Sequence, residues 1–118
     1  MSEKLTKIVL TGAAGRLGSY LREPLAALCD ELVSTDIKEA PTKLYAGETY
    51  MQADLADFYA MNAVIEGAEM VVHMGAFVDE GPFEQLLGPN FVGSYNVWEA
   101  ASRHGVRRVV YGSSIHAV

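Results

Sequence analysis

Short apolar runs alternate along the chain with longer segments in which apolar residues recur every three or four positions. The first pattern is typical of buried strands and the second of amphipathic helices. We expect strands at residues 7–11, 31–36, 49–53, 69–73 and 107–113. We expect helices at residues 16–28, 57–66 and 90–104. This alternation predicts an α/β fold of the Rossmann type, a doubly wound parallel sheet with strand order 3-2-1-4-5 and helices on both faces.

Glycine and proline mark the ends of several of these elements. Gly67 and Gly105 follow the second and third helices at the position where a helix commonly ends. Pro24 lies inside the first helix and is expected to shift or kink it. Residues 37–48 form a polar connection, and residues 75–89 are expected to be mostly loop.

A glycine turn separates the first strand from the first helix. Gly12, Gly15 and Gly18 follow one another at spacings of three. In such a turn the first glycine permits a tight bend, the second lets a pyrophosphate approach the backbone, and the third allows close helix packing. The unpaired N–H groups and the dipole of the helix favour an anion at the same place. The pattern predicts a dinucleotide site, and the alternative is a glycine-rich helix start without a ligand.

The second strand ends in a carboxylate, Asp36. Dinucleotide-binding domains place an acidic residue roughly 20 positions after the glycine turn, where it binds the adenosine ribose hydroxyls. A carboxylate there accepts hydrogen bonds from the diol of NAD and repels the additional phosphate of NADP. Arg16 could instead contact that phosphate, or be a solvated side chain in the first helical turn. We predict NAD as the cofactor.

The carboxyl ends of the later strands are expected at the rim of the same crevice. Asp54 follows the third strand and could reach the adenine amino group or cap the next helix. His73 has no second metal ligand at useful spacing, so we expect a structural role and no metal site. Ser114 and His116 would share one face of an extended strand. Because no nucleophile elbow is present, they fit hydroxyl donation to a substrate oxygen better than hydrolysis.

Composition limits the remaining classes of function. The 118 residues form a single expected domain, 1–118, which is small for a complete enzyme. A net charge of −6 argues against a nucleic-acid partner. The lone cysteine, Cys29, excludes an intrachain disulfide and is expected to pack against a helix. With no apolar run of about 20 residues and no signal peptide, we expect a cytoplasmic protein without a membrane partner.

Taken together, these motifs resemble the extended short-chain dehydrogenases/reductases, the NAD-dependent epimerase/dehydratase group. The resemblance covers essentially the whole chain. It rests on the glycine turn, Asp36, Asp54-Leu55, His73-Met74-Gly75-Ala76, Asn90-Phe91-Val92-Gly93 and Ser113-Ser114. Within the group, residues 82–85 and 90–101 and the pattern Ser113-Ser114-x-His116 are most similar to uronate dehydrogenases. Those enzymes oxidise the anomeric hydroxyl of a hexuronic acid to a lactone by hydride transfer to NAD.

The resemblance implies a role for each motif residue. Ser114 would be the catalytic serine that polarises the reacting oxygen, and it would bind substrate together with His116. The same pocket would include Val78 and Ile115, and Asn90 would help to hold a proton-relay water. The implied cofactor-binding residues are Gly12, Ala14, Gly15, Arg16, Leu17, Gly18, Asp36, Asp54, Leu55, Met74, Gly75, Ala76, Asn90 and Ser113. A homo-oligomer is also implied, because members of the group commonly associate through helices like 90–104.

The sequence departs from the uronate dehydrogenase pattern at three points. That pattern has a serine in place of Val78 and an asparagine in place of Ile115, so a less polar or differently shaped sugar remains open as substrate. Its general base, a tyrosine four residues before a lysine, is missing, since every lysine lies at or before Lys43. We therefore expect the cofactor-binding portion of a longer dehydrogenase. The alternatives are a sugar-nucleotide epimerase/dehydratase and a non-catalytic NAD-binding sensor.

Overall fold

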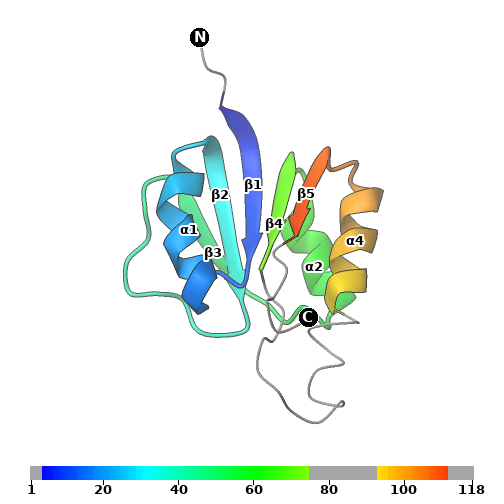
Figure 1. The fold of residues 1–118 in the computed structure, drawn as a ribbon. Coiled ribbons are helices and arrows are strands. Elements are labelled where there is room, and N and C mark those ends of the chain that lie inside the picture. Colours follow the sequence, from blue (N-terminus) through cyan, green and yellow to red (C-terminus); the bar gives the residue numbers. More distant parts are fainter. Residues whose placement is uncertain (1–3, 75–92, 112–118) are drawn as a thin grey trace, which may run out of the picture.

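The computed structural model describes residues 4–74 and 93–111, which form one parallel sheet with helices on both faces (Figure 1). The strands are β1 (Leu5–Thr11), β2 (Cys29–Asp36), β3 (Glu48–Gln52), β4 (Met70–His73) and β5 (Arg108–Tyr111). The helices are α1 (Arg16–Ala26), α2 (Phe58–Ile65) and α4 (Gly93–Arg103). The strand order is β3-β2-β1-β4-β5, which confirms the predicted order.

Alternate residues of each strand enter two separate cores. Ile8 and Leu10 of β1 face α1, where they pack with Leu32 and with the half-buried side chains of Leu21 and Leu25. On the other face lie α2 and α4 (Figure 1). The core there consists of Val9, Val33, Met61, Val64, Ile65, Ala68, Val71, Val97, Ala100 and Ala101. Because the side chains of a strand alternate between faces, one apolar run such as 8–10 supplies both cores.

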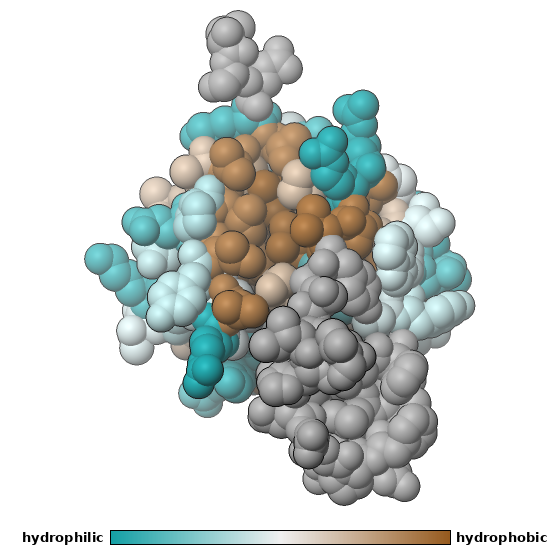
Figure 2. Space-filling view, in the orientation of Figure 1, coloured by the Kyte–Doolittle hydropathy of each residue, from teal (hydrophilic) through white to brown (hydrophobic). Residues whose placement is uncertain are grey.

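The face that carries α1 is only partly covered by the described residues. Figure 2, in the orientation of Figure 1, shows an apolar area beside α1, over β1, β4 and β5. On β5 the side chain of Val110 is 43% exposed, and Val72 opposite it belongs to the core under α1. None of the helices in the described ranges has the length and apolarity that a bilayer crossing needs.

The first helix is shorter than predicted. It ends at Ala26 rather than at residue 28, two residues beyond Pro24, and β2 begins earlier, at Cys29. Leu28 is 57% exposed, and its carbonyl accepts a hydrogen bond from the Leu5 N–H. The chain therefore leaves the helix to bring Cys29 into the sheet. The buried Cys29 thiol donates to the Leu25 carbonyl, so it packs against α1 from the strand, not from within the helix.

Other element boundaries differ by one or a few residues. β1 begins at Leu5 rather than at residue 7, and β3 spans 48–52 rather than 49–53. α2 begins at Phe58 because Asp57 is its N-cap, with the carboxylate accepting the Ala60 N–H at 3.2 Å. The described part of the third predicted helix is Gly93–Arg103, and that of the fifth strand is Arg108–Tyr111.

Candidate functional site

The turn between β1 and α1 leaves backbone donors at the carboxyl edge of the sheet. Gly12 has a φ of +69°, a left-handed conformation that favours glycine. The Gly15 N–H donates to the Gly12 carbonyl at 3.0 Å, which closes the turn. Gly15 is the N-cap of α1, and among the described residues no side chain caps this helix or places a carboxylate in its first turn. The helix start can therefore accept an anion.

Close packing explains the third glycine. A Cβ atom at Gly18 would lie 1.9 Å from the Gly12 carbonyl oxygen, so any side chain there would displace α1 from the turn. A Cβ at Gly15 would lie 3.3 Å from the same oxygen, which is tight but less severe. Gly12 and Gly18 thus have the conformational and packing roles expected from the sequence.

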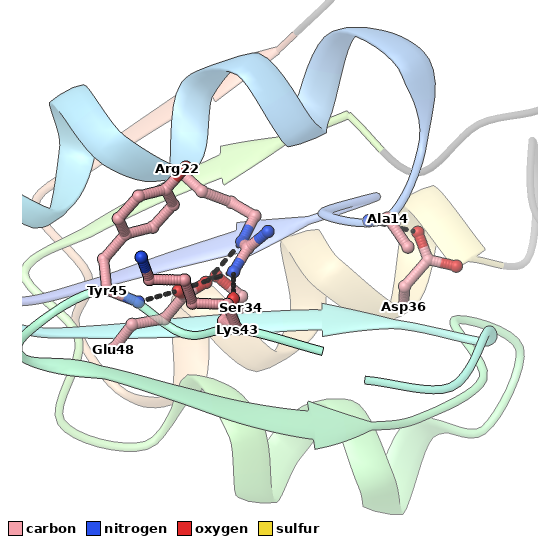
Figure 3. A network of polar contacts seen from close by, with 7 residues as sticks. All are labelled: Ala14, Arg22, Ser34, Asp36, Lys43, Tyr45 and Glu48. Carbon is pink, nitrogen blue, oxygen red and sulfur yellow. Dashed lines mark hydrogen bonds and ion pairs between the residues drawn. The ribbon is translucent and has the colours of Figure 1, made fainter. Parts of the chain in front are cut away.

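Asp36 lies directly against this turn. Its Oδ2 atom accepts the Ala14 N–H at 3.0 Å (Figure 3). Its Oδ1 atom accepts the Lys38 N–H at 3.1 Å. A carboxylate has about four acceptor positions, so both oxygens keep lone pairs for other donors. The structure therefore brings the predicted ribose-binding carboxylate to the glycine turn. Arg16 and Leu17 are both exposed in the first turn of α1.

Asp54 is not the cap of the second helix. Its Oδ1 atom accepts the Ala56 N–H at 2.9 Å within a turn, and Asp57 caps α2 instead. Leu55 packs against the core under α2 and α4. Its carbonyl accepts a hydrogen bond from the buried Asn96 amide at 2.9 Å, which ties α4 to the turn after β3.

His73 is a buried structural residue, as expected. Its Nδ1 atom lies 2.6 Å from the Thr11 hydroxyl, and its Nε2 atom lies 3.3 Å from the Ser94 hydroxyl. The Thr11 hydroxyl also accepts the Met74 N–H at 2.9 Å. Burial lowers the pKa of His73 to about 4, so the ring is neutral near pH 7. These bonds join the carboxyl ends of β1 and β4 to the first turn of α4.

The remaining predicted site residues lie outside the described residues. They are Gly75, Ala76, Val78, Asn90, Ser113, Ser114, Ile115 and His116. Within the described ranges, no group of three or more His, Cys, Asp or Glu residues could hold a metal ion. An open polar hollow is lined by Thr6, Lys7, Glu31, Ala63, Glu66 and Gly67. It lies at the amino ends of β1 and β2, away from the glycine turn, so we assign it no part in the site.

Sequence reasoning missed a buried ion pair between α1 and β3. Arg22 Nε lies 2.7 Å from Glu48 Oε2, and an Nη2 bond of 2.9 Å to Oε1 makes the pair bidentate. Glu48 also accepts the Ser34 hydroxyl at 2.6 Å and the Tyr45 N–H at 3.0 Å (Figure 3). Arg22 lies one turn from Gly18 on the buried face of α1, a spacing that could have revealed it.

The ion pair is structural and lies away from the glycine turn. Figure 3 shows it well separated from Ala14 and Asp36, because Glu48 begins β3 opposite Leu32. Burial raises the pKa of Glu48, but the bonds from Arg22, Ser34 and the Tyr45 N–H outweigh this and leave it below its usual value. The Arg22 pKa is raised chiefly by its hydrogen bond to Glu48. Both groups therefore stay charged near pH 7.

Comparison with known proteins finds dehydrogenases both by family and by individual relatives. The 3-beta hydroxysteroid dehydrogenase/isomerase family matches residues 9–118. A uronate dehydrogenase of Pseudomonas putida is 39% identical over 112 residues, which are 95% of this chain and 42% of the relative. The chain thus spans about two fifths of the length of the curated relatives it matches.

Two solved structures share the fold closely. A uronate dehydrogenase variant from Agrobacterium tumefaciens, complexed with NAD, has a TM-score of 0.87 at 41% identity. The match covers 92% of this chain and 41% of that one. A glucuronic acid dehydrogenase from Chromohalobacter salexigens has a TM-score of 0.89 at 34% identity, covering 97% of this chain and 42% of that one.

Proposed function

The chain belongs to the 3-beta hydroxysteroid dehydrogenase/isomerase family, and from this we propose that its glycine turn binds the pyrophosphate of NAD. The observation that carries the proposal is the start of α1, which no side chain of the described residues caps. The helix lies close to the turn there, because Gly18 has no side chain that would contact the Gly12 carbonyl. Backbone N–H groups at such a helix start donate to phosphate oxygens, and the helix dipole adds to the attraction. The complex of the Agrobacterium tumefaciens relative with NAD supports this choice of ligand.

We propose NAD rather than NADP because of Asp36. Its carboxylate has lone pairs available for the two ribose hydroxyls, and its charge opposes a 2′-phosphate. Arg16, the residue that could instead contact that phosphate, is exposed in the first turn of α1. The proposed cofactor contacts in the described residues are Gly12, Ala14, Gly15, Arg16, Leu17, Gly18, Asp36, Asp54, Leu55 and Met74.

For the whole protein we propose oxidation of a sugar acid of the hexuronic type. Bound NAD would accept a hydride from the carbon that bears the reacting hydroxyl, and that hydroxyl would lose its proton to a base. The support is the name of the relatives at about 40% identity, which are uronate dehydrogenases. Ser114 would polarise the reacting oxygen, and His116, Val78 and Ile115 would line the substrate pocket. Gly75, Ala76, Asn90 and Ser113 would complete the cofactor site. A homo-oligomer in the cytoplasm is part of the same proposal.

Calorimetric titration of the full-length protein with NAD and NADP tests the cofactor proposal. We expect NAD to bind more tightly than NADP. We expect Gly15→Val to weaken NAD binding by about tenfold or more, because a side chain at this position would keep the pyrophosphate from approaching the backbone. Ser102→Val, at an exposed position near the end of α4, is the matched control and should bind NAD normally. Absence of binding by the wild type, or equal binding by both variants, would refute the proposal.

A further inference from the structure

The position of the Asp36 carboxylate depends on the backbone that follows it. Its Oδ1 atom accepts the Lys38 N–H at 3.1 Å, so the carboxylate is held where the turn at residues 36–38 places that donor. The other oxygen is held by the Ala14 N–H at 3.0 Å. Any movement of this turn therefore moves one of the two contacts that orient Asp36 toward the glycine turn.

Two side chains of β3 hold the turn from the neighbouring strand. The Tyr50 hydroxyl donates to the Lys38 carbonyl at 2.6 Å, and the Gln52 amide nitrogen donates to the Ile37 carbonyl at 2.8 Å. The Ala53 N–H adds a bond of 3.0 Å to the Asp36 carbonyl. Three consecutive carbonyls are thus fixed by three donors from β3 and the residue after it.

The register of the sheet explains why these two residues reach the turn. Tyr50 lies opposite Ser34 and Gln52 lies opposite Asp36 in the parallel pairing of β2 with β3. Side chains two apart in a strand point to the same face, so both lie on the face that carries Asp36. Thr49 precedes Tyr50 and Met51 lies between the two residues, so both side chains point to the opposite face and cannot replace them.

We propose that Tyr50 and Gln52 are positioning residues that hold the turn at 36–38, and thereby set the affinity for the adenosine ribose and the preference for NAD. This inference rests on the proposed cofactor function. If the turn is fixed, the Asp36 carboxylate is held at one distance from the 2′-hydroxyl of the adenosine ribose. On a loosened turn it binds the ribose less well, and it can also move away from a 2′-phosphate, so discrimination against NADP falls as well.

The titration of Tyr50 is consistent with this role. Burial, followed by the nearby negative charge of Asp36, raises the pKa of the Tyr50 phenol to about 12. The phenol therefore keeps its proton and remains a donor to the Lys38 carbonyl throughout the physiological range of pH. The effect of the Asp36 charge also agrees with the two side chains lying on the same face.

Kinetics of the full-length protein with Tyr50→Phe and Gln52→Met test the inference. Each substitution removes one donor and nearly preserves the side-chain volume. A hydrogen bond of this kind corresponds to about a two- to tenfold change in an equilibrium. We expect KM for NAD to rise by about that factor with kcat nearly unchanged, and the ratio of kcat/KM for NAD to that for NADP to fall. Tyr59→Phe is the matched control, because that tyrosine is 84% exposed on α2.

The outcomes separate the two proposals. If the wild type binds neither dinucleotide, the proposed function fails and this inference fails with it. If the wild type binds NAD and both variants keep its KM and its preference over NADP, only the inference is overturned. A fall in kcat and thermal stability with KM unchanged would show a purely structural role and would also overturn it. Faster amide hydrogen exchange at Lys38 in Tyr50→Phe, without cofactor, is the expected independent sign of the loosened turn.

Discussion

Two polar residues at the same edge of the sheet differ in role because they differ in burial. His73 and Asp36 both end strands, at the carboxyl edge where the glycine turn lies. Burial leaves His73 neutral between the hydroxyls of Thr11 and Ser94. Asp36 stays half-buried and keeps oxygen lone pairs open. The same edge of the sheet therefore contains one residue that joins elements and one that can face a ligand.

The neutral histidine predicts a pH-dependent stability. In the unfolded chain His73 takes up a proton below about pH 6.5, whereas in the folded protein it does so only near pH 4. The unfolded state therefore binds more protons in this window, and stability falls as the pH falls. Between pH 6.5 and pH 4.5 we expect a loss of roughly 2 kcal/mol in the free energy of unfolding.

Urea denaturation across this range measures the effect. His73→Gln should flatten the slope between pH 6.5 and pH 4.5, because no titrating ring remains at the site. Ser102→Val, at an exposed position near the end of α4, should keep it. Below pH 4.5 the protonation of Glu48 adds a further loss, so the test is confined to the higher range. An unchanged slope in His73→Gln would contradict the prediction.

At the level of elements, a buried ion pair joins α1 to β3, the strand at one edge of the sheet. Glu48 binds both Arg22 of α1 and the Ser34 hydroxyl of β2. The Arg22 Nη2 atom also donates to the Lys43 carbonyl at 2.8 Å. The guanidinium lies 5.1 Å from the centre of the Tyr45 ring. Helix, two strands and the connection between them are thus held at one point. The glycine turn depends on this indirectly, since α1 must keep its place against Gly12.

Removing one partner should be strongly destabilising. Glu48→Ala leaves the Arg22 charge buried without its partner, and we expect a loss of about 3–5 kcal/mol in the free energy of unfolding. Glu99→Ala is the matched control, because it breaks the exposed pair with Arg103 on α4 and should lose less than about 1 kcal/mol. Denaturation of the two variants at pH 7 gives the comparison. Equal losses in the free energy of unfolding would contradict the prediction that the Arg22–Glu48 pair contributes more than the exposed pair.

On the scale of the whole molecule, the described elements supply the residues that we propose for one half of the cofactor site. The glycine turn, Asp36 and the ends of β1 and β4 lie along one edge of the sheet. The chain spans about two fifths of the length of its relatives, and it contains no tyrosine followed by a lysine at the fourth position. The proposal of a sugar-acid substrate is therefore tested on the full-length protein.

A substrate screen of the full-length protein belongs to this scale. Hexuronic acids and neutral sugars are supplied with NAD, and the absorbance of NADH is followed. We expect galacturonate or glucuronate to be oxidised, because the uronate dehydrogenases are the relatives at about 40% identity. Neutral sugars serve as the control for the carboxylate. Oxidation of a neutral sugar alone would refute the sugar-acid proposal, although hydride transfer to NAD would stand; Val78 and Ile115 would then be the first residues to examine.

Much of the fold could be predicted because local patterns reflect local physics. The apolar run at β1, the glycine turn and the periodicity of α1 each depend on residues close in sequence. They were sufficient for the strand order, since parallel strands joined by helices have few allowed arrangements. The place of Asp36 followed for the same reason, because it ends the strand next to β1.

Contacts between distant residues were decided only by the tertiary structure. Arg22 and Glu48 are 26 positions apart, so the helical spacing that places Arg22 on the buried face of α1 could not identify its partner. α1 ends at Ala26 and Cys29 already belongs to β2. This boundary reflects pairing within the sheet, which helix propensity does not predict. Likewise Tyr50 and Gln52 reach the turn after Asp36 only through the register of β2 with β3. The sequence by itself determined which elements form and in what order, whereas packing across the sheet decided which polar side chains meet.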